Sequence, residues 1–449
     1  MKATIFVVVF LLLIPQLYAY QKYAYVSVLS SNDFLIPAKV LAYRLKKLNS
    51  AIPYVIIVTQ DILKQSVDEL REQGVIIHED TKIDTPYLKT HKARKYQYTK
   101  IRLWKMTEFD VIVHLDLDVL PTRDISELFE CGSFCAVFRH SDMFNSGVFV
   151  LKTNKTTFNE MQEKVVSTVS YDGGDQGFLN SFFNDLKYSP MYDSTRKSSD
   201  CAIYSMRRLS AKFNYDIGMY YLNNGRFLVD PNIIHYTMGP TKPWFWWTYP
   251  LFDLNWIWLD ARQEMERNLR TEFDVSLLLA ATNALVIVFL VAVYMIIDRI
   301  GTRHVSKYVS NTETHLAFHG LYSLSLYFSW KLAYETASPI PAWIYFTSNM
   351  AWINAINGAI YTRLRTSISI KLKSILKCVV FLSLCQALFW IFVSQISTFS
   401  TRVIVAFFLF FTQQFLVVNF SRYVFTLWNL NCSKNYRYQC LPNNNDLTE

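Results

Sequence analysis

The chain has 449 residues, of which 51% are hydrophobic and 18% are charged, and its formal net charge is +9. This composition is too apolar for an ordinary soluble enzyme, so membrane-spanning segments are expected, and the positive charge alone gives no reason to expect a nucleic-acid partner. The seven cysteines include no CxxC pair, which argues against a zinc module of that type and against a dense disulfide framework.

The first residues, "MKATIFVVVFLLLIPQLYAY", contain one lysine followed by an apolar run. The run is shorter than the roughly 20 residues that span a bilayer and ends at the small residue Ala19, which is typical of a secretory signal peptide at residues 1–19. Leu17 is a poor residue at the −3 position, so an uncleaved anchor stays open. In both cases the segment that follows is expected to enter the secretory lumen.

Residues 20–270 have the pattern of one α/β domain. Short apolar runs such as "YVIIVT" and "VIVHLDL" alternate with helix-like segments such as "IPAKVLAYRLKKL". Strands that alternate with helices predict a largely parallel sheet. If this domain is lumenal, a Cys131–Cys135 or a Cys131–Cys201 bridge stays open.

Residues 271–428 have the composition of a helical membrane domain. Five apolar segments follow one another there, and buried helices of a soluble protein would not supply five in succession. The predicted spans are Val275–Ile297, Thr314–Tyr334, Pro341–Tyr361, Ser374–Ile396 and Val403–Phe425.

Basic residues occur in alternate links between these spans. "RIGTRHVSK" and "TRLRTSISIKLK" are basic, whereas "ETASP" and "STFST" carry no basic residue. The positive-inside rule therefore predicts a lumenal globular half and a cytosolic tail at residues 429–449, in agreement with the signal peptide. The expected location is the Golgi or endoplasmic reticulum membrane, in a multi-pass arrangement.

The stretch "VIVHLDLDVLP" ends an apolar strand with two carboxylates, Asp116 and Asp118. Residues two apart on a strand point to the same side, so these oxygens face one place. Paired acids repel unless a cation lies between them, and hard oxygen ligands suit Mg²⁺ or Mn²⁺. Ligands of open α/β sheets bind beyond the carboxyl ends of strands, where these acids lie. On this short motif alone, a solvated loop is an equally good interpretation.

Three motifs follow the acids in order: F-N-S-G from Phe144, D-G-G-D-Q-G-F-L-N from Asp172 and H-x3-G-x2-K-P-W from His235. Together with the acids they resemble the glycogenin-like family 8 of retaining glycosyltransferases, over residues 23–262. "HYTMGPTKPW" and "WWTYPLFDLNW" are closest to the plant branch, and the multi-span half is similar to the inositol phosphorylceramide glucuronosyltransferases within that branch. The resemblance implies a GT-A fold, a Rossmann-like nucleotide-diphospho-sugar transferase domain.

The resemblance also implies a metal site. Asp116, Asp118 and His235 would hold Mn²⁺ (or Mg²⁺), which neutralises the departing diphosphate. A core histidine is the alternative for His235.

Further roles at the donor, a UDP-sugar, follow from the same resemblance. Asp175 and Gln176 would lie near the reacting carbon of the sugar, and Lys242 would bind the diphosphate and assist its departure. The alternatives are turn chemistry around the two glycines and a plain surface lysine. Contacts with the uridine are implied for Leu29, Ser31 and Asn32. Other donor contacts are implied for Lys100, Leu117, Asn145, Ser146, Asp172 and Gly239.

The donor sugar and the reaction course are less constrained. The family retains the anomeric configuration, and front-face attack assisted by the leaving phosphate is favoured over a carboxylate nucleophile. Glucuronate follows from the resemblance alone. Arg94, Lys95 and Arg102 are available for its carboxylate or for the diphosphate, so UDP-glucose, UDP-galactose and UDP-N-acetylglucosamine stay open.

A lipid acceptor, a sphingolipid such as inositol phosphorylceramide, is the economical hypothesis because five spans exceed what anchoring needs. The aromatic stretch "KPWFWWTYPLFDLNWIW" suits a membrane interface, although domain core is an equal interpretation. Two alternatives stay open: a protein or polysaccharide acceptor, and a non-catalytic membrane protein that binds or carries sugar nucleotides.

Overall fold

The computed structural model describes residues 22–87, 97–138, 142–195, 205–249, 251–269, 273–300, 339–366 and 370–408, with a few single residues between 320 and 331. Four predictions lie wholly or mostly outside the described residues: the signal peptide, the second and fifth spans, and the tail. The chain divides into two units, residues 1–240 and 241–449. The predicted domain limits at residues 20–270, 271–428 and 429–449 stay predictions.

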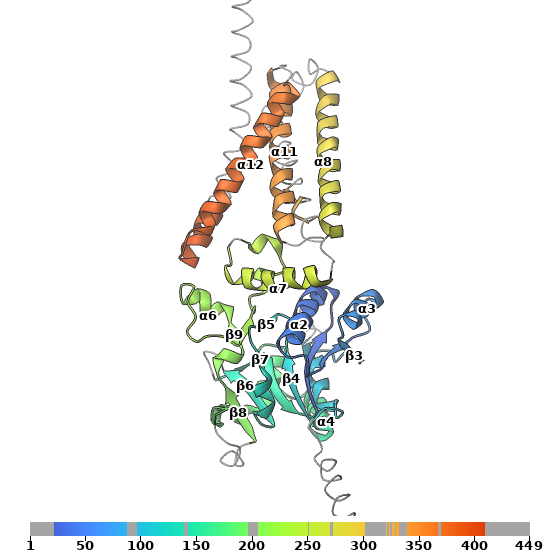
Figure 1. Cartoon of the computed structure of the whole chain (residues 1–449), viewed down its shortest axis with the longest axis vertical. Helices are drawn as coiled ribbons and strands as arrows, with labels where there is room; N and C mark the ends of the chain where they lie inside the picture. The colour runs from blue at the N-terminus through green and yellow to red at the C-terminus, as the bar shows by residue number, and fades with distance from the viewer. Residues whose placement is uncertain are drawn as a thin grey trace, which may run out of the picture. The chain divides into compact units, whose positions relative to one another are not determined.

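A seven-stranded sheet forms the core of the first unit (Figure 1). β7 runs antiparallel to its two neighbours, and the other neighbouring pairs are parallel. The order turns back at β1, and ligands of such sheets bind at this switch point, beyond the carboxyl ends of the strands. The parallel pairs outnumber the antiparallel ones, which confirms the predicted, largely parallel sheet. Its strands, in spatial order, are β3 (Ile76–Glu79), β2 (Tyr54–Val58), β1 (Tyr23–Leu29), β4 (Val111–Leu115), β7 (Phe144–Lys152), β6 (Phe134–Phe138) and β8 (Met206–Leu209).

Helices cover both faces of this sheet. Apolar side chains of α2 (Leu35–Leu48) and α3 (Lys64–Glu72) pack on one face. The other face is covered by the 3-10 helix η4 (Gln97–Lys105), α4 (Lys155–Lys164) and α5 (Asp175–Phe182). Every residue of β2 and β4 is consequently buried, which explains their continuous apolar runs. Short 3-10 helices join the elements: η2 (Asn32–Phe34), η5 (Ser126–Glu130), η6 (Asn184–Tyr188) and η8 (Ala211–Phe213).

A smaller three-stranded sheet joins segments that are far apart in the sequence. It contains β5 (Val119–Pro121), β10 (Ile233–His235) and β9 (Tyr215–Asp216), and α6 (Ile217–Leu222) follows β9. β10 pairs antiparallel with β5 and places His235 opposite Val119. The strand that directly follows the two acids is thus the partner of the strand that carries the histidine.

Cys131 and Cys135 form a disulfide bond, which is one of the two pairings that the sequence left open. The bridge lies between η5 and β6. Cys201, the partner in the other pairing, lies outside the described residues.

The second unit is helical in its described part. Its longer helices are α7 (Leu254–Leu269), α8 (Phe273–Ile300), α11 (Pro339–Thr366) and α12 (Leu372–Ser394). Two described segments, Ala280–Arg299 and Leu372–Ser394, are long and apolar enough to cross a membrane by length and composition. They overlap the first and fourth predicted spans. Helix α11, which overlaps the third predicted span, is not apolar enough to meet the same criterion. Short helices η9 (Gly239–Thr241) and η10 (Trp246–Thr248) precede α7.

Much of the aromatic stretch packs inside this second unit. The ring of Trp246 lies 5.0 Å from that of Trp343 and 5.1 Å from that of Phe346, both on α11. Trp258 on α7 is buried as well, whereas Trp256 is 40% exposed. The domain-core interpretation therefore applies to Trp246 and Trp258.

Trp104 of η4 provides a test of the packing on one face of the large sheet. Its ring is buried and lies 5.7 Å from Phe149 and 5.8 Å from Phe183. We expect Trp104→Ala to lower the free energy of unfolding of the first unit by about 3–5 kcal/mol, because a large cavity replaces the ring. The free energy of unfolding is measured by pulse proteolysis of the protein at increasing urea concentrations. The exposed Val166→Ala should change it by less than about 0.5 kcal/mol, and equal effects of the two variants would contradict the packing described.

Candidate metal and sugar-nucleotide site

Two carboxylates and one imidazole converge at the carboxyl end of β4. One ligand atom each from Asp116, Asp118 and His235 lies within 4.8 Å of the other two. The Nε2 atom of His235 is 3.2 Å from Oδ1 of Asp118. Carboxylate oxygens with an imidazole nitrogen form a donor set that suits Mn²⁺, so the residues present fit a divalent cation. The structure thus assembles the predicted trio, whose role as ligands stays a prediction.

Backbone pairing holds this trio in place. The backbone N–H of Tyr236, next to the histidine, donates to the carbonyl oxygen of Asp118 at 2.9 Å. The backbone N–H of Asp116 donates to the carbonyl oxygen of Gly147 on β7 at 2.7 Å. Both acids therefore sit on backbone that is hydrogen-bonded to other strands, which limits how far they can move apart.

Gly147, in the F-N-S-G motif, provides the surface against which the imidazole lies. A Cβ atom at this position would be 2.2 Å from Cε1 and 2.8 Å from Nδ1 of His235. Only glycine leaves room for the ring here, because real Cβ atoms do not approach other atoms so closely. The motif therefore has a steric function at the site.

Lys100 neutralises the acidic side of the site. Its Nζ atom is 2.8 Å from Oδ1 of Asp116 and 2.8 Å from Oδ2 of Asp175. Burial alone would lower the pKa of Lys100, but the two carboxylates outweigh burial and raise it above its usual value. Burial likewise opposes ionisation of Asp116, yet Lys100 and His114 hold the pKa of Asp116 well below its usual range. Asp116 is thus ionised at neutral pH and ready to act as a ligand.

His114 contacts the same acid from inside the sheet. It is fully buried on β4, and its Nε2 atom lies 3.1 Å from Oδ1 of Asp116. Its Nδ1 atom lies 3.0 Å from the carbonyl oxygen of Val26 on β1. Burial lowers the pKa of His114. His114 lies two positions before Asp116 in the sequence but is not among the residues predicted for the site.

Asp172 builds the turn that begins α5. Its Oδ1 atom accepts hydrogen bonds from the N–H groups of Gly174 and Gly177, at 3.0 and 2.9 Å, and from the hydroxyl of Ser170 at 2.9 Å. A Cβ atom at Gly177 would lie 2.6 Å from this oxygen. The turn chemistry that the sequence offered as an alternative accounts for these contacts, and a donor contact of Asp172 stays a prediction.

Gln176 is fixed by polar groups on both sides. Its Oε1 atom accepts a hydrogen bond from Nδ2 of Asn145 at 2.7 Å, and its Nε2 donates to the hydroxyl of Tyr171 at 2.5 Å. Asn145 in turn accepts from Nδ2 of Asn214 at 2.8 Å. The predicted pair Asn145 and Gln176 is thus in direct contact. Tyr171 and Asn214 were missed, because a single polar residue outside a motif gives no signal in one sequence.

The residues predicted to contact uridine lie at the end of β1. Leu29 is buried, and the hydroxyl of Ser31 accepts from the backbone N–H of Asp33 at the start of η2. The Oδ1 atom of Asn32 accepts from the N–H of Leu63 at 3.1 Å and from the hydroxyl of Ser66 at 3.0 Å. Asn32 therefore holds the β2–α3 loop in this structure, and its contact with the base stays a prediction.

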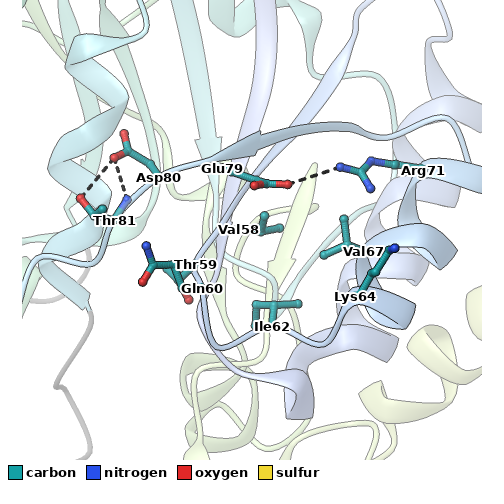
Figure 2. A pocket seen from close by; sticks show the side chains of 10 residues that line it. All are labelled: Val58, Thr59, Gln60, Ile62, Lys64, Val67, Arg71, Glu79, Asp80 and Thr81. Atoms are coloured by element: carbon teal, nitrogen blue, oxygen red, sulfur yellow. Dashed lines mark hydrogen bonds and ion pairs between the residues drawn. The ribbon is translucent and has the colours of Figure 1, made fainter.

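This loop borders a pocket of about 460 Å³ beyond the carboxyl ends of β2 and β3. Figure 2 shows its lining, in which Arg71 of α3 reaches toward Glu79 at the end of β3, with 3.5 Å between Nη2 and Oε1. The pocket opens at the same sheet edge as the acids of β4, but two and three strands away. Its mixed charges point to no particular ligand.

Several predicted contacts are not tested by this geometry. Lys242 belongs to the second unit, and its approach to the diphosphate stays a prediction. Gly239 is exposed, and a Cβ there would meet no described atom within 4 Å. Arg94 and Lys95 lie outside the described residues. Arg102 is engaged elsewhere, since its Nη2 donates to the hydroxyl of Thr81 at 2.7 Å.

The comparisons with known proteins agree with the motifs. The family model described as glycosyl transferase family 8 matches residues 25–133 and 136–248, which include every predicted site residue. Inositol phosphorylceramide glucuronosyltransferase 1 of Arabidopsis thaliana is 34% identical over 255 residues, or 55% of this chain and 47% of the relative. A putative glucuronosyltransferase, PGSIP8, of the same plant is 30% identical over 253 residues, or 55% of this chain and 50% of the relative. The match thus spans about half the length of each relative.

Among solved structures, the galactosyltransferase LgtC in complex with donor and acceptor sugar analogues is similar with a TM-score of 0.40 and 15% identity. The match covers 54% of this chain and 95% of that chain. A likeness of this size supports no statement about substrates.

The contact between Gly147 and His235 makes a specific prediction. We expect Gly147→Ala to weaken Mn²⁺ binding by at least about tenfold, because the added methyl group displaces the imidazole from the acids. Titration of metal-free protein with Mn²⁺, followed by electron paramagnetic resonance, measures the dissociation constant. Gly218→Ala is the control, since the methyl group there comes no closer than 3.2 Å to Asp216. Unchanged Mn²⁺ affinity in Gly147→Ala would contradict the assigned position of the ring.

Proposed function

The chain belongs to glycosyltransferase family 8, and from this membership we propose that it is a metal-dependent enzyme that moves a sugar from a UDP-sugar to a membrane lipid with retention of configuration. One observation supports the chemistry above all: two aspartates and a distant histidine converge at the switch point of the sheet. A surface loop with two acids would have no reason to bury an imidazole beside them.

The proposed roles follow from charge. Breaking the bond between sugar and diphosphate leaves negative charge on the departing oxygens. Asp116, Asp118 and His235 would hold the Mn²⁺ or Mg²⁺ ion that neutralises this charge as a Lewis acid. Lys242 would add a second positive charge at the leaving group. Lys100 keeps Asp116 ionised and so maintains the ligand set.

The surroundings of Asp175 favour front-face attack over a covalent intermediate. A nucleophilic carboxylate needs an accessible oxygen, but Asp175 is only 3% exposed and its Oδ2 atom is paired with Lys100 at 2.8 Å. Gln176 carries no charge and is held by Asn145. We therefore infer that the leaving phosphate assists the acceptor hydroxyl, while Asp175 and Gln176 orient the sugar.

The proposed donor is UDP-glucuronate. Support comes from the two relatives described above, both of which are named as glucuronosyltransferases, one of them putative. Of the three cations considered for the glucuronate carboxylate, Arg94 and Lys95 lie outside the described residues, and Arg102 is paired with Thr81 and with the acid Asp80.

The proposed acceptor is a sphingolipid such as inositol phosphorylceramide, at a Golgi or endoplasmic reticulum membrane, with the first unit in the lumen. The name of one relative supports this acceptor, and the apolar segments Ala280–Arg299 and Leu372–Ser394 support a membrane location. On α8, Leu285 and Phe289 are 71% and 67% exposed, which suits contact with lipid tails.

Transfer by membranes that contain the full chain tests the proposal. With Mn²⁺ and radiolabelled UDP-glucuronate, we expect label in organic-extractable lipid, loss of transfer with a chelator, and recovery with added Mn²⁺. Asp118→Asn should lower transfer by about 10²-fold or more, because a ligand and its charge are lost while the shape is kept. Asp185→Asn, at an exposed position of η6, is the matched control and should transfer normally.

Each component of the proposal can fail separately in this assay. Transfer from UDP-glucose, UDP-galactose or UDP-N-acetylglucosamine but not from UDP-glucuronate would overturn the donor. Label in protein or polysaccharide alone would overturn the lipid acceptor. Equal transfer by Asp118→Asn, or no transfer from any donor, would overturn the metal-dependent enzyme.

A further inference from the structure

Asn214 connects the imidazole of His235 to the side chains near the reacting carbon. It lies between η8 and β9, is 1% exposed, and belongs to none of the family motifs in the sequence. Its Oδ1 atom is 2.7 Å from Nδ1 of His235, and its Nδ2 donates to Oδ1 of Asn145 at 2.8 Å. Asn145 continues the series by donating to Gln176 at 2.7 Å. The result is a row of side-chain hydrogen bonds that runs from the metal site to Gln176.

Backbone groups of β7 determine the direction of this row. The N–H of Gly147 donates to Oδ1 of Asn145 at 3.0 Å, and a backbone N–H can only donate. The oxygen of Asn145 therefore faces Gly147, and it is also the atom that Asn214 contacts. Asn214 must then present its NH₂ group to Asn145 and its oxygen to His235.

The tautomer of the imidazole follows from that orientation. An amide oxygen can only accept, so Nδ1 of His235 must carry the hydrogen. In this tautomer of the neutral ring, Nε2 carries the lone pair. This is the nitrogen that lies 3.2 Å from Oδ1 of Asp118. The ring is thus set in the tautomer and the orientation that a metal ligand needs, with Gly147 packed against one side.

We propose that Asn214 is a positioning residue with two effects: its oxygen sets the tautomer of His235 for the divalent cation, and its NH₂ group orients Asn145 and, through it, Gln176. The inference rests on the proposed function, because it presumes that His235 binds a cation. Asn214 touches neither the cation nor the sugar in this account. Groups that hold a metal-bound histidine in this way typically contribute 10–100-fold to metal affinity.

Two substitutions separate the two effects. Asn214→Ala removes the acceptor and the donor. Asn214→Asp keeps an acceptor oxygen for His235 but loses the NH₂ group that Asn145 accepts from. The proposal therefore predicts weak metal binding in the first variant, and normal metal binding with slow turnover in the second.

The experiment uses the purified full chain in detergent and two readouts. Titration of metal-free protein with Mn²⁺, followed by electron paramagnetic resonance, should give a dissociation constant about 10–100-fold higher for Asn214→Ala and within about threefold of the wild type for Asn214→Asp. Turnover at saturating Mn²⁺ should be reduced in Asn214→Asp with little change in the KM for donor. Asn232→Ala is the control, since Asn232 is also buried beside β10 but donates to Glu127 instead of contacting the ring.

The outcomes distinguish this inference from the proposed function. If the wild type binds no Mn²⁺, the metal-dependent function fails and the inference fails with it. If the wild type binds Mn²⁺ and Asn214→Ala binds it equally well, the inference alone is overturned. Loss of Mn²⁺ affinity in Asn214→Asp would also overturn the inference. An equal loss of Mn²⁺ affinity in Asn232→Ala and Asn214→Ala would overturn it as well, because a general loss of structure would then explain the effect. If Asn214→Ala does not fold, the Asn214→Asp result still decides.

Discussion

The pairing of β10 with β5 is the interaction on which the site depends. β5 begins directly after Asp118, and β10 ends with His235, so the antiparallel register of these two short strands determines how far the imidazole is from the acids. A slip of one residue would turn every side chain of β10 to the opposite face. The backbone hydrogen bond from Tyr236 to Asp118 and the glycine at position 147 oppose such a slip, one through the main chain and the other through the fit of the ring.

Charge balance is the second constraint, and it links the acids of the candidate metal site to Asp175. Asp116 and Asp175 are both close to Lys100, and a single ammonium group cannot fully neutralise both. A divalent cation at Asp116 and Asp118 would supply the missing positive charge. A cation that neutralised the charge of Asp116 would let Lys100 interact more strongly with Asp175. Binding of such a cation would therefore be coupled to the placement of Asp175 through one buried lysine, and burial strengthens this coupling because solvent screens it little.

The sequence predicted the α/β sheet, the position of the acids at its carboxyl edge, and the trio of Asp116, Asp118 and His235, because each depends on a local pattern or on a specific motif. It did not predict Asn214, since the contact of this residue with His235 arises only when β9 and β10 pair side by side. It also gave Asn32 a role at the base without revealing its hydrogen bonds to the β2–α3 loop. Side-chain contacts between distant segments depend on strand register and on packing, and neither can be predicted from a single sequence. The third predicted span overlaps α11, where Asn349 and Asn354 are buried within the helical unit, and it stays a prediction.

The aromatic stretch after Lys242 suggests why catalytic and helical units occur in one chain. His235 and Lys242 belong to one motif, and Trp246 follows only four residues later and packs on α11. The segment that contains Lys242 is therefore joined directly to a residue of the core of the helical unit. One continuous segment thus carries the end of the family motif and a residue of the helical core, and the proposed lipid acceptor gives a reason for both to occur in one chain.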